Sequence, residues 1–383
     1  MANPWKLDAA GQALLEKADA VAREVIAPAA KELDEKAQFP KAAIKAMRDA
    51  GLLKLVSAKE VGGHGQGLRA AVATCERFAR DCASTAMVTK MHFCGTAVIE
   101  AHGIPELRKA ISEHGKVTTL AFSEYGSRSH FWIPTSSATK AGDKVKLTAA
   151  KQLITSAGEC DIYVWSSKPA AAEGLSSIWA VPVDAAGIKI QQTYAGLGLR
   201  GNASAPINAT NVEIPASWAL GEDGKGFDLM MGIVMPWFSL QNCAVSVGMM
   251  EGCLERTINH VSNGKFAYNQ TVIADLPQVR GWLARARCKI DMVRGHLLDS
   301  LDAIENGRED ATLRVLQSKV IGAETSMEVH DLCMRVNGGA GYRKDNEVER
   351  FFRDSRAASV MAPVSDALYE FIGKAVCGMP VFG

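Results

Sequence analysis

The sequence predicts a multidomain α+β protein in which a β domain lies between two helical domains. Apolar residues recur with helical spacing up to about residue 115, and short β-branched runs fill the next hundred residues. Long helical patterns return after a Gly-rich turn at 221–226. At roughly 150 residues per domain, 383 residues suggest two or three domains, and we place them at 1–117, 118–222 and 223–383.

The N-terminal part reads as a series of helices. One apolar stripe with spacings of four, three and four predicts a helix over 8–32. The stripe consists of Leu14, Ala18, Val21 and Val25. A second helical pattern begins at Pro40 and is broken by Gly51 and by the glycines at 62–65, and further helices continue to about residue 115.

The middle part shows the residue patterns of strands, whereas the C-terminal part shows those of helices. Short β-branched runs separated by Gly, Asp, Asn and Pro predict strands over 117–123, 145–148, 161–166, 177–182, 188–192 and 208–214. Helical patterns cover 283–304, 313–336 and 365–375. The uncharged segment 229–250 is long enough to cross a bilayer, but it carries Pro236, Gln241 and Asn242 at its centre. We interpret it as a buried segment and not as a membrane span.

Composition narrows the class of partner. Forty-three Lys and Arg residues face 42 Asp and Glu residues, so the net charge of +1 supplies no broad attraction for nucleic acid or anionic lipid. A small molecule is the better expectation. The nine cysteines are scattered, which fits neither a disulfide framework nor a metal knuckle, and no secretion signal is visible at the start. We therefore expect a cytoplasmic protein without a metal.

A series of short motifs runs through the chain in a fixed order. They occupy 26–28, 39–40, 50–52, 62–65, 121–129, 153–156, 197–201, 337–342 and 352–354. The segment 121–129 aligns without gaps with a flavin motif of the form T-E-P-G-A-G-S. Together the series resembles the acyl-CoA dehydrogenase family over essentially the whole chain. The resemblance implies a helical domain, a β-barrel-like domain and a C-terminal four-helix bundle around bound FAD.

The resemblance also implies a set of flavin-binding residues. They are Phe122, Ser123, Ser129, Leu153 and Thr155. A hydroxyl and a main-chain amide at Ser123 suit the flavin pyrimidine edge, and Thr155 suits the central ring. Read alone, residues of these types are more often strand residues that bond their own backbone, and only the joint order of the motifs favours flavin binding.

In the family a second set of residues reaches the FAD of the neighbouring subunit. Here that set is Lys265, Tyr268, Arg335, Gly338 and Gly339. The two glycines would allow close approach of a pyrophosphate, and Arg335 would clamp it. They follow a helix and not a strand, so a Rossmann loop is rejected. The resemblance therefore implies an oligomer, usually a homotetramer built as a dimer of dimers.

The carboxylate base that the family uses is missing. Ala362 occupies one of its two known positions and Phe238 the other, and Ser239 replaces an Arg that commonly lies beside it. Neither a methyl nor a benzyl group accepts a proton. The substitutes that the sequence offers are Asp366, His92 and Gln241. Structural roles, as helix cap, satisfied wall histidine and buried hydrogen-bonding group, are the alternative for all three.

Four residues are candidates for contact with the substrate. They are Arg128, Phe238, Ser239 and Met361. Arg128 is unusual in a loop that normally carries small or acidic residues, and a guanidinium there would suit an anionic group of the substrate or the CoA phosphates.

Three functions remain open from the sequence. The first is an FAD-dependent oxidoreductase acting at the α,β bond of an acyl-CoA thioester, with electron-transfer flavoprotein as the acceptor that the family commonly uses. The second keeps the flavin and the thioester but performs elimination, as a desulfinase does, or monooxygenation. The third is a catalytically silent subunit of a mixed oligomer. A shared fold alone does not decide among them.

Overall fold

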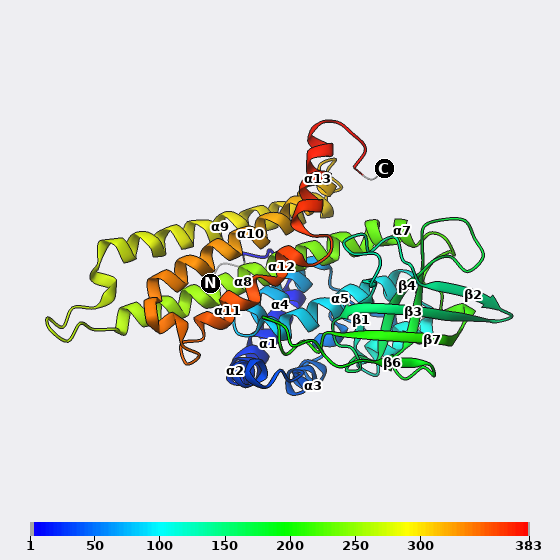
Figure 1. Cartoon of the computed structure of the whole chain (residues 1–383), viewed down its shortest axis with the longest axis horizontal. Helices are drawn as coiled ribbons and strands as arrows, with labels where there is room; N and C mark the ends of the chain where they lie inside the picture. Colours follow the sequence, from blue (N-terminus) through cyan, green and yellow to red (C-terminus); the bar gives the residue numbers. More distant parts are fainter. Residues whose placement is uncertain (1–3, 382–383) are drawn as a thin grey trace.

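Helices gather at one end of the elongated molecule and two β-sheets at the other (Figure 1). The structure, a computed structural model, describes residues 4–381. This arrangement confirms the predicted order of helical, β and helical parts.

The N-terminal part is helical, as predicted. Its helices are α1 (Ala9–Val21), α2 (Ala27–Lys36), α3 (Lys41–Asp49), α4 (Leu68–Ala79), α5 (Ala83–His102) and α6 (Pro105–Ser112). The Asp8 carboxylate caps α1 by accepting a hydrogen bond from the Gly11 amide at 2.6 Å. The helix predicted over 8–32 is therefore present, with one wider turn at 22–26 between α1 and α2.

Helix α5 joins the helical part to the sheets. Its residues from Ala83 to Ile99 are all buried, because α5 packs against α4 and α8 and also against the first strand. A helix that is covered on every side is expected to be apolar all round. Lys90 and His92 are the basic residues of this stretch, which otherwise holds apolar residues, Ser and Thr.

Two sheets form the middle part. The strands are β1 (Thr118–Ala121), β2 (Ser137–Ala141), β3 (Lys144–Ile154), β4 (Ile162–Ser167), β5 (Ser177–Pro182), β6 (Ile188–Ile190) and β7 (Ala205–Pro215). One sheet has the order β1-β4-β5, with β1 parallel to β4 and β4 antiparallel to β5. The other is antiparallel throughout, in the order β2-β3-β7-β6. The ladder between β3 and β7 contains two register shifts, the second next to Ile154 where β3 reaches the site described below.

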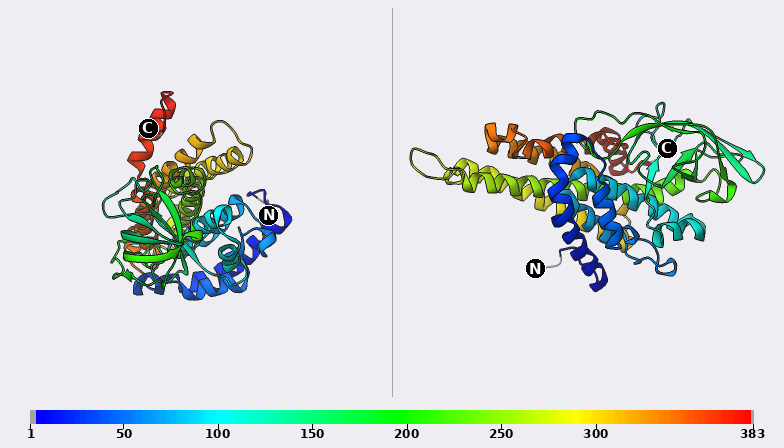
Figure 2. Two further views of the ribbon diagram at one scale, coloured as in Figure 1. Left: turned by 90° about the vertical axis from the view of Figure 1, so that its right-hand side faces the viewer. Right: turned by 90° about the horizontal axis from the view of Figure 1, so that it is seen from below.

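Long helices return in the C-terminal part. They are α7 (Gly226–Leu229), α8 (Met235–Asn263), α9 (Pro277–Glu305), α10 (Ala311–Asn337), α11 (Val348–Ser355), α12 (Ala357–Val360) and α13 (Ser365–Val376). Helices α8, α9 and α10 pack along one another, and α11 packs against α8 and α10. Helix α13 projects from the body, as Figure 1 and the left view of Figure 2 show.

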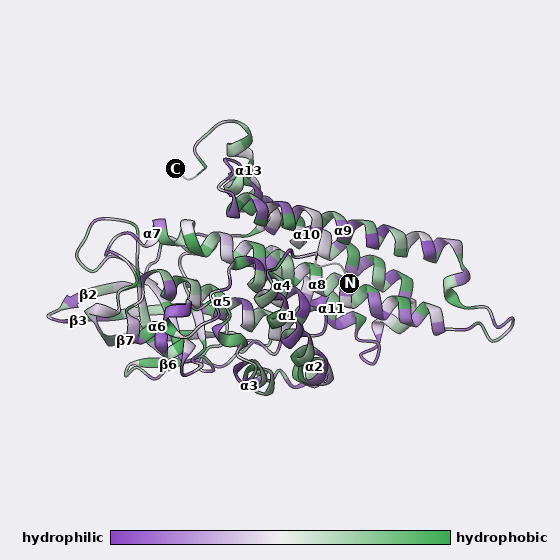
Figure 3. Cartoon of the chain, turned by 180° about the vertical axis from the view of Figure 1, so that it is seen from behind, coloured by the Kyte–Doolittle hydropathy of each residue, from purple (hydrophilic) through white to green (hydrophobic). Residues whose placement is uncertain are grey.

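The uncharged segment 229–250 belongs to the central helix of the bundle. Within residues 4–381, Gly226–Asn263 is the stretch long and apolar enough to span a membrane, and 67% of its most apolar window is buried inside the molecule. This burial agrees with the interpretation as a core helix. On α9 and α10, hydrophobic and hydrophilic residues are interleaved, as expected for helices with one buried side (Figure 3).

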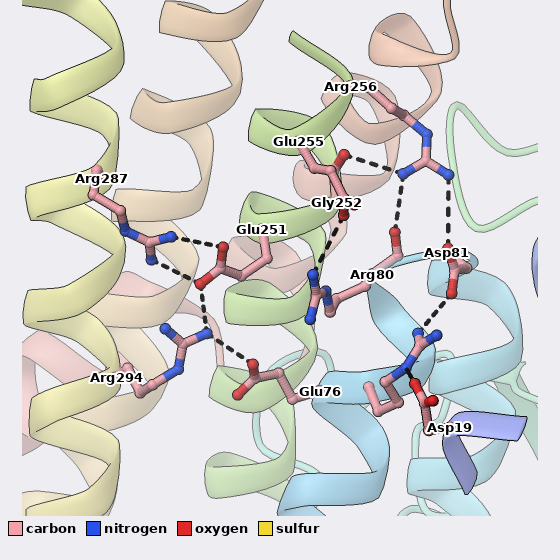
Figure 4. Close-up of polar contacts among 11 residues, drawn as sticks. Asp19, Glu76, Arg80, Asp81, Glu251, Gly252, Glu255, Arg256, Arg287 and Arg294 are labelled. Atoms are coloured by element: carbon pink, nitrogen blue, oxygen red, sulfur yellow. Dashed lines mark hydrogen bonds and ion pairs between the residues drawn. The ribbon is translucent and has the colours of Figure 1, made fainter. Parts of the chain in front are cut away.

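A network of charged side chains links α4, α8 and α9 (Figure 4). One guanidinium nitrogen of Arg294 lies 2.7 Å from Glu76 and 2.7 Å from Glu251, and Arg287 donates two hydrogen bonds to Glu251 at 2.8 and 2.7 Å. Burial raises the pKa of Glu76 although Arg294 opposes the rise. The carboxylates are nearly buried, so the arginines are needed to hold these helices together.

Candidate active site

A cavity of about 640 Å³ opens between the sheets, α5 and the start of α8. Strand ends and loops of the middle part form one wall. Met87 and Met91 of α5, Phe238 of α8 and the segment 357–364 form the other. The first wall offers main-chain and hydroxyl groups and the second is largely apolar, so the cavity suits a ligand with a polar edge and an apolar face.

The strand wall contains the first of the two sets of residues predicted to hold a flavin. Phe122, Ser123, Ser129, Leu153 and Thr155 all line the cavity. The amide of Gln152 donates to the carbonyl of Ser123 at 2.9 Å, which ties the two strand ends together. Phe122 stacks on Phe131 with ring centroids 6.3 Å apart, and this contact helps to hold the Phe122 ring in place.

This wall has features that fit a bound aromatic ring system. Leu153 is 59% exposed although it is apolar, and its φ of 56° is in the left-handed region, where a leucine is strained. The hydroxyls of Ser127 and Ser156 are buried without a hydrogen-bond partner among the described residues. The exposed Leu153 side chain is what a flavin would cover, whereas the two buried hydroxyls lie outside the cavity lining.

Glu124 is the carboxylate in the cavity lining, and it is fully engaged. It accepts hydrogen bonds from the amides and hydroxyls of Thr135 and Ser136, and from the Lys151 ammonium at 2.7 Å. Burial acts to raise the pKa of Glu124, but Lys151 and these hydrogen bonds outweigh it, so the pKa lies below its usual value. Glu124 therefore supports the strand wall and is a poor proton acceptor.

Two motifs noted in the sequence meet beneath the loop that lines the cavity at 194–204. The Asp354 carboxylate accepts a hydrogen bond from the Leu199 amide at 2.6 Å, and Arg353 pairs with Asp34 at 2.5 Å. Burial raises the pKa of Asp354 to about 6 although Arg350 opposes the rise. Arg353 and Asp354 hold the loop but do not themselves line the cavity.

Phe238, Met361 and Ala362 lie together on the helical wall, whereas Ser239 is buried outside the lining with its hydroxyl 3.6 Å from the Met235 sulfur. The structure thus brings together Phe238 and Ala362, the two positions at which the resemblance led us to expect a base. A methyl group and an aromatic ring are what the cavity presents there.

The structure does not bring the three suggested substitutes for the base to the cavity lining. The amide of Thr118 donates to His92 Nδ1 at 3.2 Å, so Nε2 carries the hydrogen that it donates to the Leu53 carbonyl at 2.7 Å. Burial lowers the pKa of His92 to about 4. Asp366 is exposed in the first turn of α13, and Gln241 is buried and donates to the Trp237 carbonyl at 2.9 Å. His92 and Gln241 thus have structural hydrogen-bonding roles, and Asp366 is a surface carboxylate that does not cap α13.

Arg128 lies at the mouth of the cavity. Its side chain is exposed, its φ is 50°, and no ion pair with it occurs among residues 4–381. The next residue, Ser129, accepts a hydrogen bond from the Val364 amide at 3.1 Å and so joins this loop to the C-terminal part. Arg128 is therefore free to meet an anionic group at the opening.

The second set of predicted cofactor residues lies at the other end of the molecule. Lys265 and Tyr268 are in the loop between α8 and α9, at the far tip of the bundle from the sheets (Figure 1), and Tyr268 is 82% exposed. Arg335 stacks over Trp282 at 5.3 Å, and a Cβ added to Gly338 or Gly339 would meet no atom within 4 Å. Within one chain, none of these residues reaches the cavity.

Two buried lysines behind the helical wall are absent from the sequence prediction. Lys90 of α5 lies with its ammonium 3.8 Å from the centre of the Phe238 ring. Lys319 of α10 donates to the carbonyls of Ala358, Met361 and Pro363 at 3.3, 3.0 and 2.7 Å. A signal was available for Lys90, since it is the sole Lys, Arg, Asp or Glu residue in the stretch 82–99.

The fold and the site define a flavoenzyme with a cavity between a β domain and a helical bundle, and comparison with known proteins specifies the family. Models of the acyl-CoA dehydrogenase N-terminal, middle and C-terminal domains match residues 9–113, 119–212 and 224–377. The chain belongs to the acyl-CoA dehydrogenase family. It is accordingly an FAD-dependent oxidoreductase of the type that acts on CH–CH groups.

Individual relatives are distant but cover the whole chain. A cyclohex-1-ene-1-carbonyl-CoA dehydrogenase of Geobacter metallireducens is 27% identical over 365 residues, 93% of this chain and 95% of that protein. A probable acyl-CoA dehydrogenase of Mycobacterium tuberculosis is 29% identical over 353 residues, 89% of this chain and 88% of the relative. The structure of butyryl-CoA dehydrogenase from Megasphaera elsdenii matches with a TM-score of 0.90 at 19% identity, over 97% of this chain and 99% of that one. A glutaryl-coenzyme A dehydrogenase complex with glutaryl-CoA matches with a TM-score of 0.91 at 22% identity, over 98% and 97%.

Proposed function

We propose that this chain uses FAD to oxidise an acyl-CoA thioester at the bond between its α and β carbons. The observation that carries the proposal is the two-sided cavity, polar along the strand ends and apolar along Met87, Met91 and Phe238. When bound, FAD supplies the acceptor for the hydride of the β carbon. The chain's own residues bind and orient the reactants and move the α proton.

The strand wall is proposed to hold the flavin. The groups involved are Phe122, Ser123, Ser129, Leu153 and Thr155. Leu153 would pack on the ring, and the hydroxyls of Ser123 and Thr155 would bond its polar edge. Met361 and Phe238 would enclose the acyl group on the opposite side, and Arg128 at the mouth would meet the CoA phosphates.

Lys265, Tyr268, Arg335, Gly338 and Gly339 are proposed to serve the FAD of a second subunit. They lie in one region at the far end of the bundle, and several of them are open to solvent in the single chain. A second copy placed there would complete a site that one chain leaves unfinished, which supports a homotetramer built as a dimer of dimers. An electron-transfer flavoprotein would then be the partner that reoxidises the flavin.

An anaerobic titration of the purified flavoprotein with a panel of acyl-CoA thioesters tests the proposal. We expect one of the thioesters to bleach the oxidised-flavin absorbance, with one enoyl-CoA formed per flavin reduced. A thioester consumed while the flavin stays oxidised would contradict dehydrogenation and indicate elimination. A protein that binds no flavin and changes no thioester would indicate a silent subunit.

A further inference from the structure

Oxidation at the α,β bond requires a group that takes the α proton, and the cavity lining does not supply it. The titratable residues in the lining are Glu124, Tyr125, Arg128, Tyr194 and Arg200. Glu124 is held by Lys151 and four further hydrogen bonds, and a guanidinium does not lose its proton in a protein. A tyrosine ordinarily ionises near pH 10 and is protonated at neutral pH. The acceptor must therefore come from behind the lining.

Lys90 lies directly behind the apolar wall. Its ammonium nitrogen is 3.8 Å from the centre of the Phe238 ring and 3.9 Å from the Met361 sulfur, and both of these side chains line the cavity. One layer of side chains thus separates the nitrogen from the space where an acyl group would lie. Phe238 is itself only partly buried, and its side chain faces open volume on the cavity side.

Lys90 has mostly weak partners for an ammonium. Its three N–H donors face one oxygen, Asn242 Oδ1 at 3.0 Å, together with the Met361 sulfur at 3.9 Å and the Phe238 ring at 3.8 Å. The side chain is 0% exposed, so water does not complete its hydrogen bonds. Burial lowers the pKa of such an amine, so a larger fraction of it is in the neutral form, which carries the lone pair that a proton acceptor needs.

The titratable groups that face Lys90 supply no anion within residues 4–381. Cys94 on its own helix and Cys75 on α4 are buried thiols whose pKa values burial raises, so they stay neutral. Helix α8 presents Asn242 and Phe238, and α10 presents Lys319, whose pKa burial lowers to about 7. Burial lowers the pKa of Lys90 to about 8. No carboxylate among the described residues pairs with either lysine.

We propose that Lys90 is the proton acceptor of this enzyme, an inference that rests on the proposed oxidation of a thioester. The lone pair of neutral Nζ forms an N–H bond with the α hydrogen. The C–H bond breaks, and its electron pair passes into the thioester enolate. Phe238 and Met361 turn aside to admit the nitrogen, and the resulting ammonium later releases its proton to solvent.

Lys319 is equally buried but does not suit this role. Its three N–H groups are directed at three carbonyl oxygens between residues 358 and 363, so no lone pair is turned toward the cavity. It fixes the segment that carries Met361 and Ala362 instead. Burial lowers the pKa of Lys319 to about 7, and the nearby charge of Lys90 contributes to this shift.

The test follows the α proton separately from flavin reduction. Purified holoenzyme is mixed in deuterium oxide with a thioester that reduces the wild-type flavin, and with its analogue that has no β hydrogen. Mass spectrometry measures uptake of deuterium at the α carbon of the analogue. Binding of the analogue is measured by the perturbation of the flavin absorbance. The variants are Lys90→Met, Lys90→Arg, which keeps the charge but accepts no proton, and Lys90→Ala.

We expect Lys90→Met and Lys90→Arg to bind the analogue within about threefold of wild type but to exchange its α proton at least about 100-fold more slowly. Added ethylamine should restore exchange in Lys90→Ala in proportion to the neutral amine, which a merely structural lysine would not do. Exchange at the wild-type rate in Lys90→Met would overturn the assignment and leave the proposed function intact. Failure of every thioester to perturb the wild-type flavin would overturn both.

Discussion

Replacing Lys90 by Met should change the pH dependence of stability in a way that the buried amine dictates. The folded pKa of about 8 lies about 2.5 units below the unfolded value of 10.5. At about 1.36 kcal/mol per unit, burial of the charged form costs about 3 kcal/mol below pH 8. Between pH 8 and 10.5 the unfolded chain binds more protons than the folded one, so the free energy of unfolding of wild type gains this amount as pH rises.

The variant lacks this gain. At pH 7 the variant avoids the cost of about 3 kcal/mol for burying the ammonium, but Asn242 Oδ1 loses its donor, which costs about 1–3 kcal/mol. We therefore expect Lys90→Met to equal wild type or exceed it by up to about 2 kcal/mol at pH 7. Near pH 10.5 the free energy of unfolding of the variant should fall below that of wild type. At this pH the buried lysine of wild type is neutral, so its burial costs no charge penalty, and the variant still lacks the hydrogen bond to Asn242.

Urea unfolding of both proteins at pH 7, 8, 9 and 10, at equal protein and FAD concentrations, measures the difference. Other titrating groups are common to the two proteins and largely cancel. The difference should shift toward wild type by about 3 kcal/mol across this range. A difference that stays constant within about 0.5 kcal/mol would refute the reasoning, because it would show that Lys90 titrates alike in the folded and unfolded chains.

Three further changes test the remaining assignments. Arg294→Met leaves Glu76 without its guanidinium and Glu251 with Arg287 alone. It should lower the free energy of unfolding at pH 7 by about 3 kcal/mol, less at pH 5 because protonation of Glu76 relieves the buried charge, and a loss under 1 kcal/mol in urea unfolding would contradict this. His92→Gln should lower the melting temperature by several degrees yet leave α-proton exchange within about threefold of wild type, and a 100-fold loss would restore His92 as a base. Asp366→Asn should leave both stability and exchange unchanged, and a large loss of exchange would show that α13 folds over the cavity.

The strands show what a local pattern does and does not predict. The run 177–182 is a strand with the predicted bounds, because its β-branched and aromatic residues are buried along their whole length. Strand β2, Ser137–Ala141, was missed. It consists of small and charged residues, is largely exposed and lies at the edge of its sheet, so neither burial nor alternation leaves a signal. It forms because β3 offers it a partner strand.

Of the candidate site, too, one part was predicted from the sequence and another was not. The strand-end residues at 122–123 and 153–155 line the cavity, since a motif with a defined backbone conformation fixes where its side chains lie. The helical wall was harder to predict. On α5, Met87 and Met91 are one turn apart and face the cavity together, and Lys90 borders that face as the residue three after Met87. His92, five after Met87, turns to the opposite side and bonds Leu53.

A lysine in an apolar helix is itself information about function. Positions 86, 87, 93 and 94, one turn to either side of Lys90, hold no acid, and the same is true of positions 315, 316, 322 and 323 around Lys319. Neither lysine can therefore be neutralised by its own helix, and both break the local rule that buried charges are paired. Three carbonyl oxygens accept hydrogen bonds from Lys319 and offset the cost of burying its ammonium. Lys90 has one amide oxygen as acceptor and lies next to the cavity. Residues that break a local rule without local compensation are expected at functional sites. Burial of Lys90 costs stability because it disfavours the ammonium. The same burial increases the fraction of neutral amine, which is the form that the proposed reaction uses, so the function would explain why the cost is retained.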